Sequence, residues 1–227
     1  MRQFEAMIKN LSPRIEFCVV VVAAFGWFVL GSVASIGART SGPMITERHL
    51  IGVLAYEVIV LLVLTSFLAT RGWTPARVGL VPSWRSSAVG LLVATLAYVA
   101  YLIAWAGASY IFPNSVEPAE SASLVASGIG LGTILAVSVL NPLFEELFLC
   151  GYLITVLKEG RGFWFAVNIS AGVRLVYHLY QGPLGVISIL PLGLVFGYWY
   201  ARTKQLWPLV VAHAAFDLVA LLWYAAA

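Results

Sequence analysis

Two adjacent carboxylates stand inside a strongly apolar stretch of the sequence, NPLFEELFLCGYL, which runs from Asn141 to Leu153. Around a helix, Glu145 and Glu146 are about 100° apart, so both side chains can face one interior cavity. An ionisable side chain at mid-membrane costs at least about 2.5–3.5 kcal/mol and therefore tends to mark function. The pair is a candidate for activating a water molecule, because burial makes a carboxylate a stronger base.

Four more ionisable groups follow on two later apolar stretches. Arg174 and His178 in RLVYH are four residues apart, and so are His213 and Asp217 in HAAFD, so each pair shares a helix face. If these helices pack together, two carboxylates and two histidines either bind a divalent metal or activate a water directly. Proton relays and transporters use the same groups, so that alternative stays open.

A buried polar group can also be purely structural. Glu57 stands alone on its apolar stretch, and one hydrogen bond to a neighbouring helix would account for it equally well. A lone histidine on an apolar face is more often a satisfied core residue than a ligand. The other six groups all fall between residues 145 and 217, which favours a common site.

The elements that must position these residues belong to a membrane protein. The chain has 227 residues, 61% hydrophobic and 10% charged, with a mean hydropathy of +0.94, whereas soluble domains carry about 25% charged residues. We predict an all-α, polytopic transmembrane bundle with seven spans, at 17–36, 50–70, 86–112, 124–157, 162–181, 183–201 and 206–226. The fourth is long enough to tilt, to break near Pro142 or to hide an eighth span.

A single domain is predicted. Residues 1–16 should form a cytoplasmic or interfacial segment without a signal-peptide cleavage site, and residues 17–227 one transmembrane domain with its motifs in 141–220. The small residues of GLVFG (193–197) would let the sixth span pack closely on a neighbour, whereas the oligomeric state is left open.

The distribution of charge predicts orientation. With the N-terminus in the cytoplasm, nearly all Lys and Arg residues lie inside and only Arg39 and Arg48 lie outside, as the positive-inside rule requires. We therefore expect a multi-pass protein of the cell membrane. The net charge of +3 reports this topology, and no basic stripe with interleaved aromatic residues points to nucleic acid.

Helix depth indicates an irregularity in the fifth span. At ~1.5 Å per residue, His178 would lie roughly 25 Å from the cytoplasmic end, against roughly 13 Å for His213 and 18 Å for Glu145. We therefore expect the QGP turn (181–183) to lie inside the protein, or the fifth helix to begin later than drawn.

EELFLCGYL, RLVYHLYQG and HAAFD, in that order, resemble the CPBP family of intramembrane proteases, the CAAX-protease and bacteriocin-processing family. The family pattern is EExxxR, then FxxxH, then Hxxx followed by Asn or an Asp-like residue. The resemblance implies that Glu145 activates water with His178 as its partner, and that Glu146 is the second glutamate. His213 and Asp217 match the positions that stabilise the oxyanion. The implied substrate is a peptide or protein in or at the lipid bilayer, and in CAAX-type members it is lipid-modified.

The family resemblance leaves the cofactor open. Members have been described as metalloproteases, and a metal-free glutamate mechanism has also been proposed for them. A zinc ion would have Glu145, His178 and His213 as its candidate ligands.

Three positions depart from the family pattern. Cys150 replaces the arginine of EExxxR and Arg174 replaces the phenylalanine of FxxxH, so we interpret Arg174 as supplying the guanidinium that Cys150 lacks. Asp217 replaces asparagine; because an ionised carboxylate repels an oxyanion, we expect it to orient His213 instead. The departures leave open a non-catalytic membrane protein, such as a bacteriocin-immunity or scaffold factor. A proton-coupled transporter is less favoured, because we find no inverted repeats.

Overall fold

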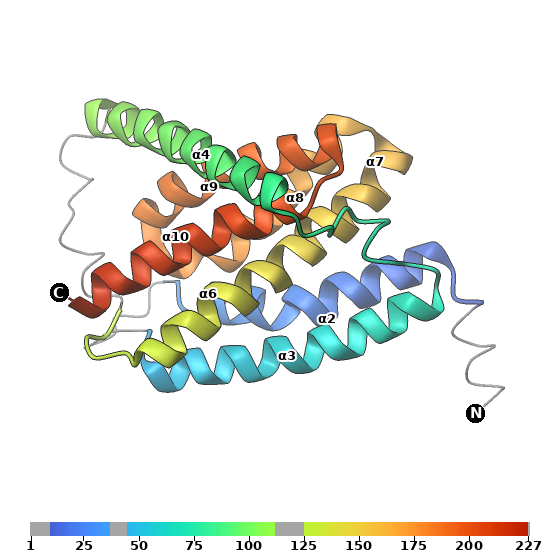
Figure 1. Ribbon diagram of the computed structural model, residues 1–227, viewed down its shortest axis with the longest axis horizontal. Coiled ribbons are helices and arrows are strands. Elements are labelled where there is room, and N and C mark those ends of the chain that lie inside the picture. Colours follow the sequence, from blue (N-terminus) through green and yellow to red (C-terminus); the bar gives the residue numbers. More distant parts are fainter. Residues whose placement is uncertain (1–9, 37–44, 112–124, 227) are drawn as a thin grey trace.

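The computed structural model describes residues 10–36, 45–111 and 125–226 of the chain. Every regular element in these ranges is helical, which confirms the all-α class (Figure 1). The elements are α2 (Pro13–Ala34), α3 (Glu47–Thr70), α4 (Trp84–Ile111), α6 (Leu131–Glu145), η1 (Glu146–Ile154), α7 (Thr155–Arg161), α8 (Phe163–Tyr177), η2 (Leu179–Gln181), α9 (Gly182–Thr203) and α10 (Trp207–Ala226).

Within the described ranges, six helical stretches are long and apolar enough to cross a membrane. Seven spans are therefore not confirmed, because the predicted span 162–181 folds as the shorter helix α8. Its 15 residues cover roughly 22 Å at about 1.5 Å per residue, less than the ~30 Å hydrocarbon core. The α8 helix therefore does not span the bilayer by itself.

The turn after α8 is packed against the first span. The Tyr180 N–H donates to Ser32 Oγ of α2 at 3.1 Å, and Gln181 and Gly182 are half-buried. Gly182 has φ 69°, a left-handed conformation that glycine adopts without steric cost. The residue before the QGP segment thus meets α2, whereas Gln181 ends η2 and Gly182 begins α9.

Helix α9 packs against α8, and two glycines of α9 lie at the contact. A side chain at Gly193 would meet Ala171, and one at Gly197 would meet Val167, both residues of α8. The close contact predicted from GLVFG is confirmed, and it lies within the chain. This packing holds the face of α8 that carries Arg174.

A continuous helical stretch formed by α6, η1 and α7 runs through the middle of the molecule (Figure 1). It is the most buried of the candidate spans. In the view of Figure 1, α2 and α3 lie on one side of it and α4, α9 and α10 on the other. The two carboxylates near the centre of this stretch can therefore meet side chains of helices on both sides of it.

The central part of this stretch, η1, is a π-helix. Pro142 in α6 has no N–H to donate, and the wide turns begin four residues later at Glu146. Phe148 and Tyr152 pack with α2 and α3, whereas Cys150 and Leu153 pack with α8, α9 and α10. In lipid, burying apolar side chains between helices gains little free energy from the hydrophobic effect. Close packing on both sides therefore stabilises the contacts of η1 with its neighbours.

Hydroxyl groups satisfy backbone carbonyls of the π-helix. Ser170 Oγ of α8 donates to Leu149 O at 3.0 Å. Thr155 Oγ1 and the Tyr200 hydroxyl both donate to Gly151 O, at 2.7 and 3.1 Å. The irregular geometry is therefore supported by neighbouring helices, as buried backbone groups require.

The first span begins earlier than predicted, at Pro13, with Ser12 as its N-cap. Residues 1–9 of the predicted segment 1–16 lie outside the described residues. Glu16 is buried and accepts hydrogen bonds from Arg71 Nε at 2.7 Å and the Tyr152 hydroxyl at 3.1 Å. This carboxylate ties the start of α2 to the end of α3 and to η1.

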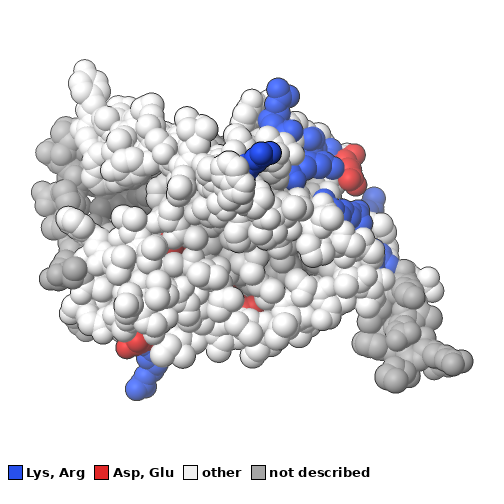
Figure 2. Space-filling model, viewed as in Figure 1, with Lys and Arg blue, Asp and Glu red and all other residues white. Residues whose placement is uncertain are grey.

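Charged side chains concentrate at one end of the molecule. Figure 2 shows Lys and Arg gathered over α7 and the turn between α9 and α10, which carry Lys158, Arg161, Arg202 and Lys204. A smaller basic and acidic group appears over the start of α3, at the opposite end. Of the two basic residues predicted outside, Arg48 lies at that start and Arg39 lies outside the described residues.

Candidate active site

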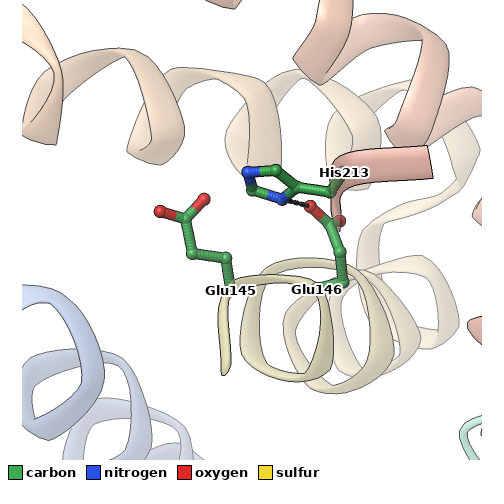
Figure 3. A group of neighbouring side chains, drawn as sticks. All are labelled: Glu145, Glu146 and His213. Atoms are coloured by element: carbon green, nitrogen blue, oxygen red, sulfur yellow. Dashed lines mark hydrogen bonds and ion pairs between the residues drawn. The ribbon is translucent and has the colours of Figure 1, made fainter. Parts of the chain in front are cut away.

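The paired glutamates occupy the junction between α6 and η1. Glu145 ends α6 and Glu146 opens η1, and both carboxylates lie on the side of the helix that faces the His213 ring of α10 (Figure 3). The exposed fraction is 6% for Glu145 and 0% for Glu146. The expectation that both lean into one interior region agrees with this arrangement.

Arg174 of α8 contacts both carboxylates. Its Nη1 lies 3.1 Å from Glu145 Oε2 and its Nη2 lies 2.6 Å from Glu146 Oε1. The side chain is 2% exposed, so these are buried ion pairs. The guanidinium divides its two terminal nitrogens between two carboxylates and does not bind either one through both oxygens.

Cys150 occupies the position of the family arginine and faces the same site. Its Sγ lies 3.2 Å from Glu146 Oε2, and the residue is fully buried. A thiol is a weak donor and carries no positive charge here. The guanidinium therefore reaches the glutamate pair from α8, as the exchange of residue types at 150 and 174 suggested.

His213 lies between two carboxylates. Its Nδ1 is 2.7 Å from Glu146 Oε1, and its Nε2 is 3.5 Å from Asp217 Oδ1. The expected pairing of His213 with Asp217 is present, but it is the longer of the two contacts. Glu146 consequently has a donor on each oxygen, with Arg174 and His213 on Oε1 and Cys150 on Oε2.

His178 follows the last residue of α8 and is less tightly integrated. Its Nδ1 lies 2.9 Å from the backbone oxygen of Arg174; because a carbonyl only accepts, this nitrogen carries the proton and Nε2 is left as an acceptor. Among the described residues, no hydrogen bond joins His178 to Glu145 or to His213.

Sequence reasoning missed Asn141, which joins two buried glutamates. Its Nδ2 lies 2.7 Å from Glu57 Oε1 and 3.3 Å from Glu145 Oε1. The spacing of four residues between Asn141 and Glu145 was a signal, since it places both on one helix face. Glu57 bonds to a neighbouring helix, as one of its two interpretations required.

The donor groups converge but do not fit a divalent metal as they are arranged. Ligand atoms of Glu145, Glu146 and His213 lie within 4.8 Å of one another; of the predicted zinc ligands, His178 is not in this group. The Arg174 guanidinium already contacts both carboxylates, at 3.1 and 2.6 Å. A divalent ion would have to displace or repel this cation.

One comparison with known proteins identifies the region that holds these groups. Residues 126–219 match the family described as type II CAAX prenyl endopeptidase, Rce1-like. The resemblance to the CPBP family is confirmed. The CPBP match covers less than half of the chain, and it includes every site residue named above except Glu57. Comparisons with curated proteins and with solved structures gave no match.

The CPBP match and the six possible spans agree that the chain is a multi-pass membrane protein. The family is one of CAAX-type proteases. In the structure, Arg174 supplies the guanidinium that contacts both glutamates, and Cys150 contacts Glu146.

Proposed function

We propose that this protein is an intramembrane endopeptidase that cleaves a membrane-associated or lipid-modified protein with a water activated by Glu145. The observation that carries the proposal is the convergence of three helices on one buried site within the CPBP segment. Glu145, Arg174 and His213 come from α6, α8 and α10. Separate structural roles for these groups would not require them to meet.

Glu145 is better suited than Glu146 to act as the base. Glu146 accepts contacts from Arg174, His213 and Cys150, which leaves it little capacity to bind water. Glu145 has one contact with Arg174 and a longer one with Asn141, and the Tyr177 hydroxyl also interacts with its carboxylate. Its two oxygens have four lone pairs, so at least one stays available to take a proton from water. We therefore assign Glu146 to holding Arg174 and His213 in place.

The two histidines have different proposed roles. His178 Nε2 is the acceptor that can carry the proton from Glu145 to the leaving amine. His213 faces a carboxylate at each nitrogen, and its 3.5 Å contact with Asp217 is loose. Its Nε2–H can therefore turn to the oxyanion of the tetrahedral intermediate, with Asp217 keeping the ring oriented.

We further propose that hydrolysis needs no divalent metal. Arg174 neutralises part of the charge of the glutamate pair, which is the electrostatic role that zinc would otherwise fill. Neighbouring residues of α9 hold the Arg174 side chain in place. Gly193 packs against it, and the centroid of the Phe196 ring lies 5.8 Å from its guanidinium carbon.

The direct test is peptide cleavage by the purified protein in lipid nanodiscs, compared with Glu145→Gln. The variant keeps the size of the side chain and one of its two acceptor oxygens but removes its basicity, so kcat should fall by about 10²- to 10⁴-fold. Glu159→Gln is the matched control, since Glu159 lies exposed on α7 of the same helical stretch. A zinc chelator should leave the wild-type rate unchanged.

Full activity of Glu145→Gln would overturn the assignment of the base, and a rate lost with the chelator and restored by zinc would overturn the metal-free mechanism. Absence of cleavage of CAAX-type and unmodified membrane peptides alike would favour the non-catalytic alternative.

A further inference from the structure

Glu57 is a buried carboxylate that lies outside the three sequence motifs. It sits within α3, is 1% exposed, and is contacted by Asn141 Nδ2 at 2.7 Å from its Oε1. Its other oxygen, Oε2, is buried and has no hydrogen-bond partner among the described residues. No ion pair with Arg, Lys or His is formed by Glu57 within the same part of the chain. Burying such a group in a membrane costs free energy, and intramembrane carboxylates therefore tend to have a function.

Asn141 turns this isolated group toward the glutamate pair. Its amide nitrogen carries two N–H groups, and it lies 2.7 Å from Glu57 and 3.3 Å from Glu145 Oε1. Because a carboxylate oxygen accepts hydrogen bonds, Glu57 favours the orientation of the Asn141 amide in which Nδ2, and not Oδ1, faces Glu57. The second N–H of the same group then points toward Glu145.

The orientation of Glu145 decides how Arg174 can bind it. Guanidinium and carboxylate groups readily pair through two parallel hydrogen bonds. Here Glu145 offers Arg174 only Oε2, at 3.1 Å, while Oε1 is engaged by Asn141. Released from Asn141, the carboxylate can rotate and place both oxygens on the guanidinium. The syn lone pairs of both oxygens, which are the more basic ones, would then face the guanidinium, and only the weaker anti lone pairs would remain to bind and deprotonate water.

We propose that Asn141 and Glu57 are positioning residues that keep Glu145 from closing into a two-oxygen pair with Arg174. Asn141 acts on Glu145 directly, and Glu57 acts through Asn141. The kinetic part of this inference rests on the proposed peptidase function, whereas its structural part does not.

The kinetic test is a double-mutant cycle on peptide cleavage. Asn141→Leu and Glu57→Leu should each lower kcat by about 10- to 100-fold, because a misoriented base costs rate without weakening substrate binding, so KM should stay the same. The double variant should lose no more than Asn141→Leu alone. Glu57→Gln should recover most of the rate, since its carbonyl oxygen can still accept from Asn141.

Thr65→Val on α3 is the matched control, because among the described residues Thr65 Oγ1 bonds only to backbone carbonyls of its own helix. Its kcat should equal that of the wild type. The inference would be overturned if the losses of kcat in the two single variants multiplied in the double variant. It would also be overturned if KM rose while kcat stayed unchanged.

The structural test does not depend on catalysis. Experimental structures of Asn141→Leu and Glu57→Leu should show both oxygens of Glu145 within hydrogen-bonding distance of Arg174. Glu145 found with Oε1 still turned away in both variants would refute the proposal, whether or not the wild type cleaves peptides. If Glu57→Leu fails to fold, Asn141→Leu carries the same comparison.

Discussion

At the scale of single residues, charge balance decides whether two glutamates can share a buried site. Arg174 is the cation that contacts both Glu145 and Glu146, and it stands where the family pattern has phenylalanine. Cys150, at the arginine position of the pattern, contacts the other oxygen of Glu146, Oε2. Residues 150 and 174 therefore both reach Glu146, from different helices.

This geometry predicts the outcome of moving the guanidinium. Arg174→Leu should abolish cleavage and destabilise the fold by about 3–5 kcal/mol, because it leaves buried carboxylates without their partner. Adding Cys150→Arg to Arg174→Leu should restore part of both, since the new side chain can enter the space that Arg174 vacates. Thermal unfolding and peptide cleavage measure the two effects.

Cys150→Ser with Arg174 intact is the control, because a hydroxyl can still donate to Glu146 and adds no charge. Wild-type activity in a stable Arg174→Leu protein would show that the guanidinium is dispensable.

At the scale of elements, close helix crossings set the positions of the site residues. Helix α10, which carries His213, crosses α4 at Gly90. A Cβ at Gly90 would lie 2.7 Å from Pro208 O and 2.8 Å from Val211 Cβ. Real Cβ atoms do not approach so closely, so any larger residue must push the two helices apart.

Gly90→Ala should therefore lower stability by about 1–3 kcal/mol, the usual cost of overpacking. The rate of cleavage should fall as well, because Val211 lies two residues from His213. Gly107→Ala on the same helix is the control, as nothing lies within 4 Å of its added Cβ, and it should be neutral or stabilising by up to about 1 kcal/mol, because alanine is the better helix former. Equal unfolding temperatures for the two variants would show that the α4–α10 contact is not tight.

At the scale of the whole molecule, the charge asymmetry sets the proposed orientation. The Lys and Arg residues of α7 and of the turn between α9 and α10 lie at one end, and the start of α3 lies at the other (Figure 2). By the positive-inside rule, we propose that the first end is cytoplasmic.

Labelling with a membrane-impermeant maleimide tests this orientation, in a Cys18→Ala background. Arg202→Cys should react only from the cytoplasmic side and Arg48→Cys only from the outer side, because both residues are exposed and lie at opposite ends. The buried Cys150 should stay unlabelled in both. The reverse pattern would invert the proposed topology.

Local chemistry made much of this protein predictable from its sequence alone. A backbone in lipid must satisfy its own hydrogen bonds, so long apolar stretches become helices wherever they occur. The spacing of His213 and Asp217 places them on one face, and the order of the motifs along the sequence indicates the CPBP family. The apolar length of 162–181 was misleading, because a turn packed on Ser32 ends α8 early.

Only the tertiary structure decided which groups meet. Arg174 contacts both glutamates, His213 contacts Glu146, and Asn141 contacts Glu57. Each of these contacts joins two different helices. Such contacts depend on where each helix is rotated and how deeply it packs, which side-chain packing across the interfaces determines. Periodicity along the chain reports the face of a helix but not the neighbour that this face will find.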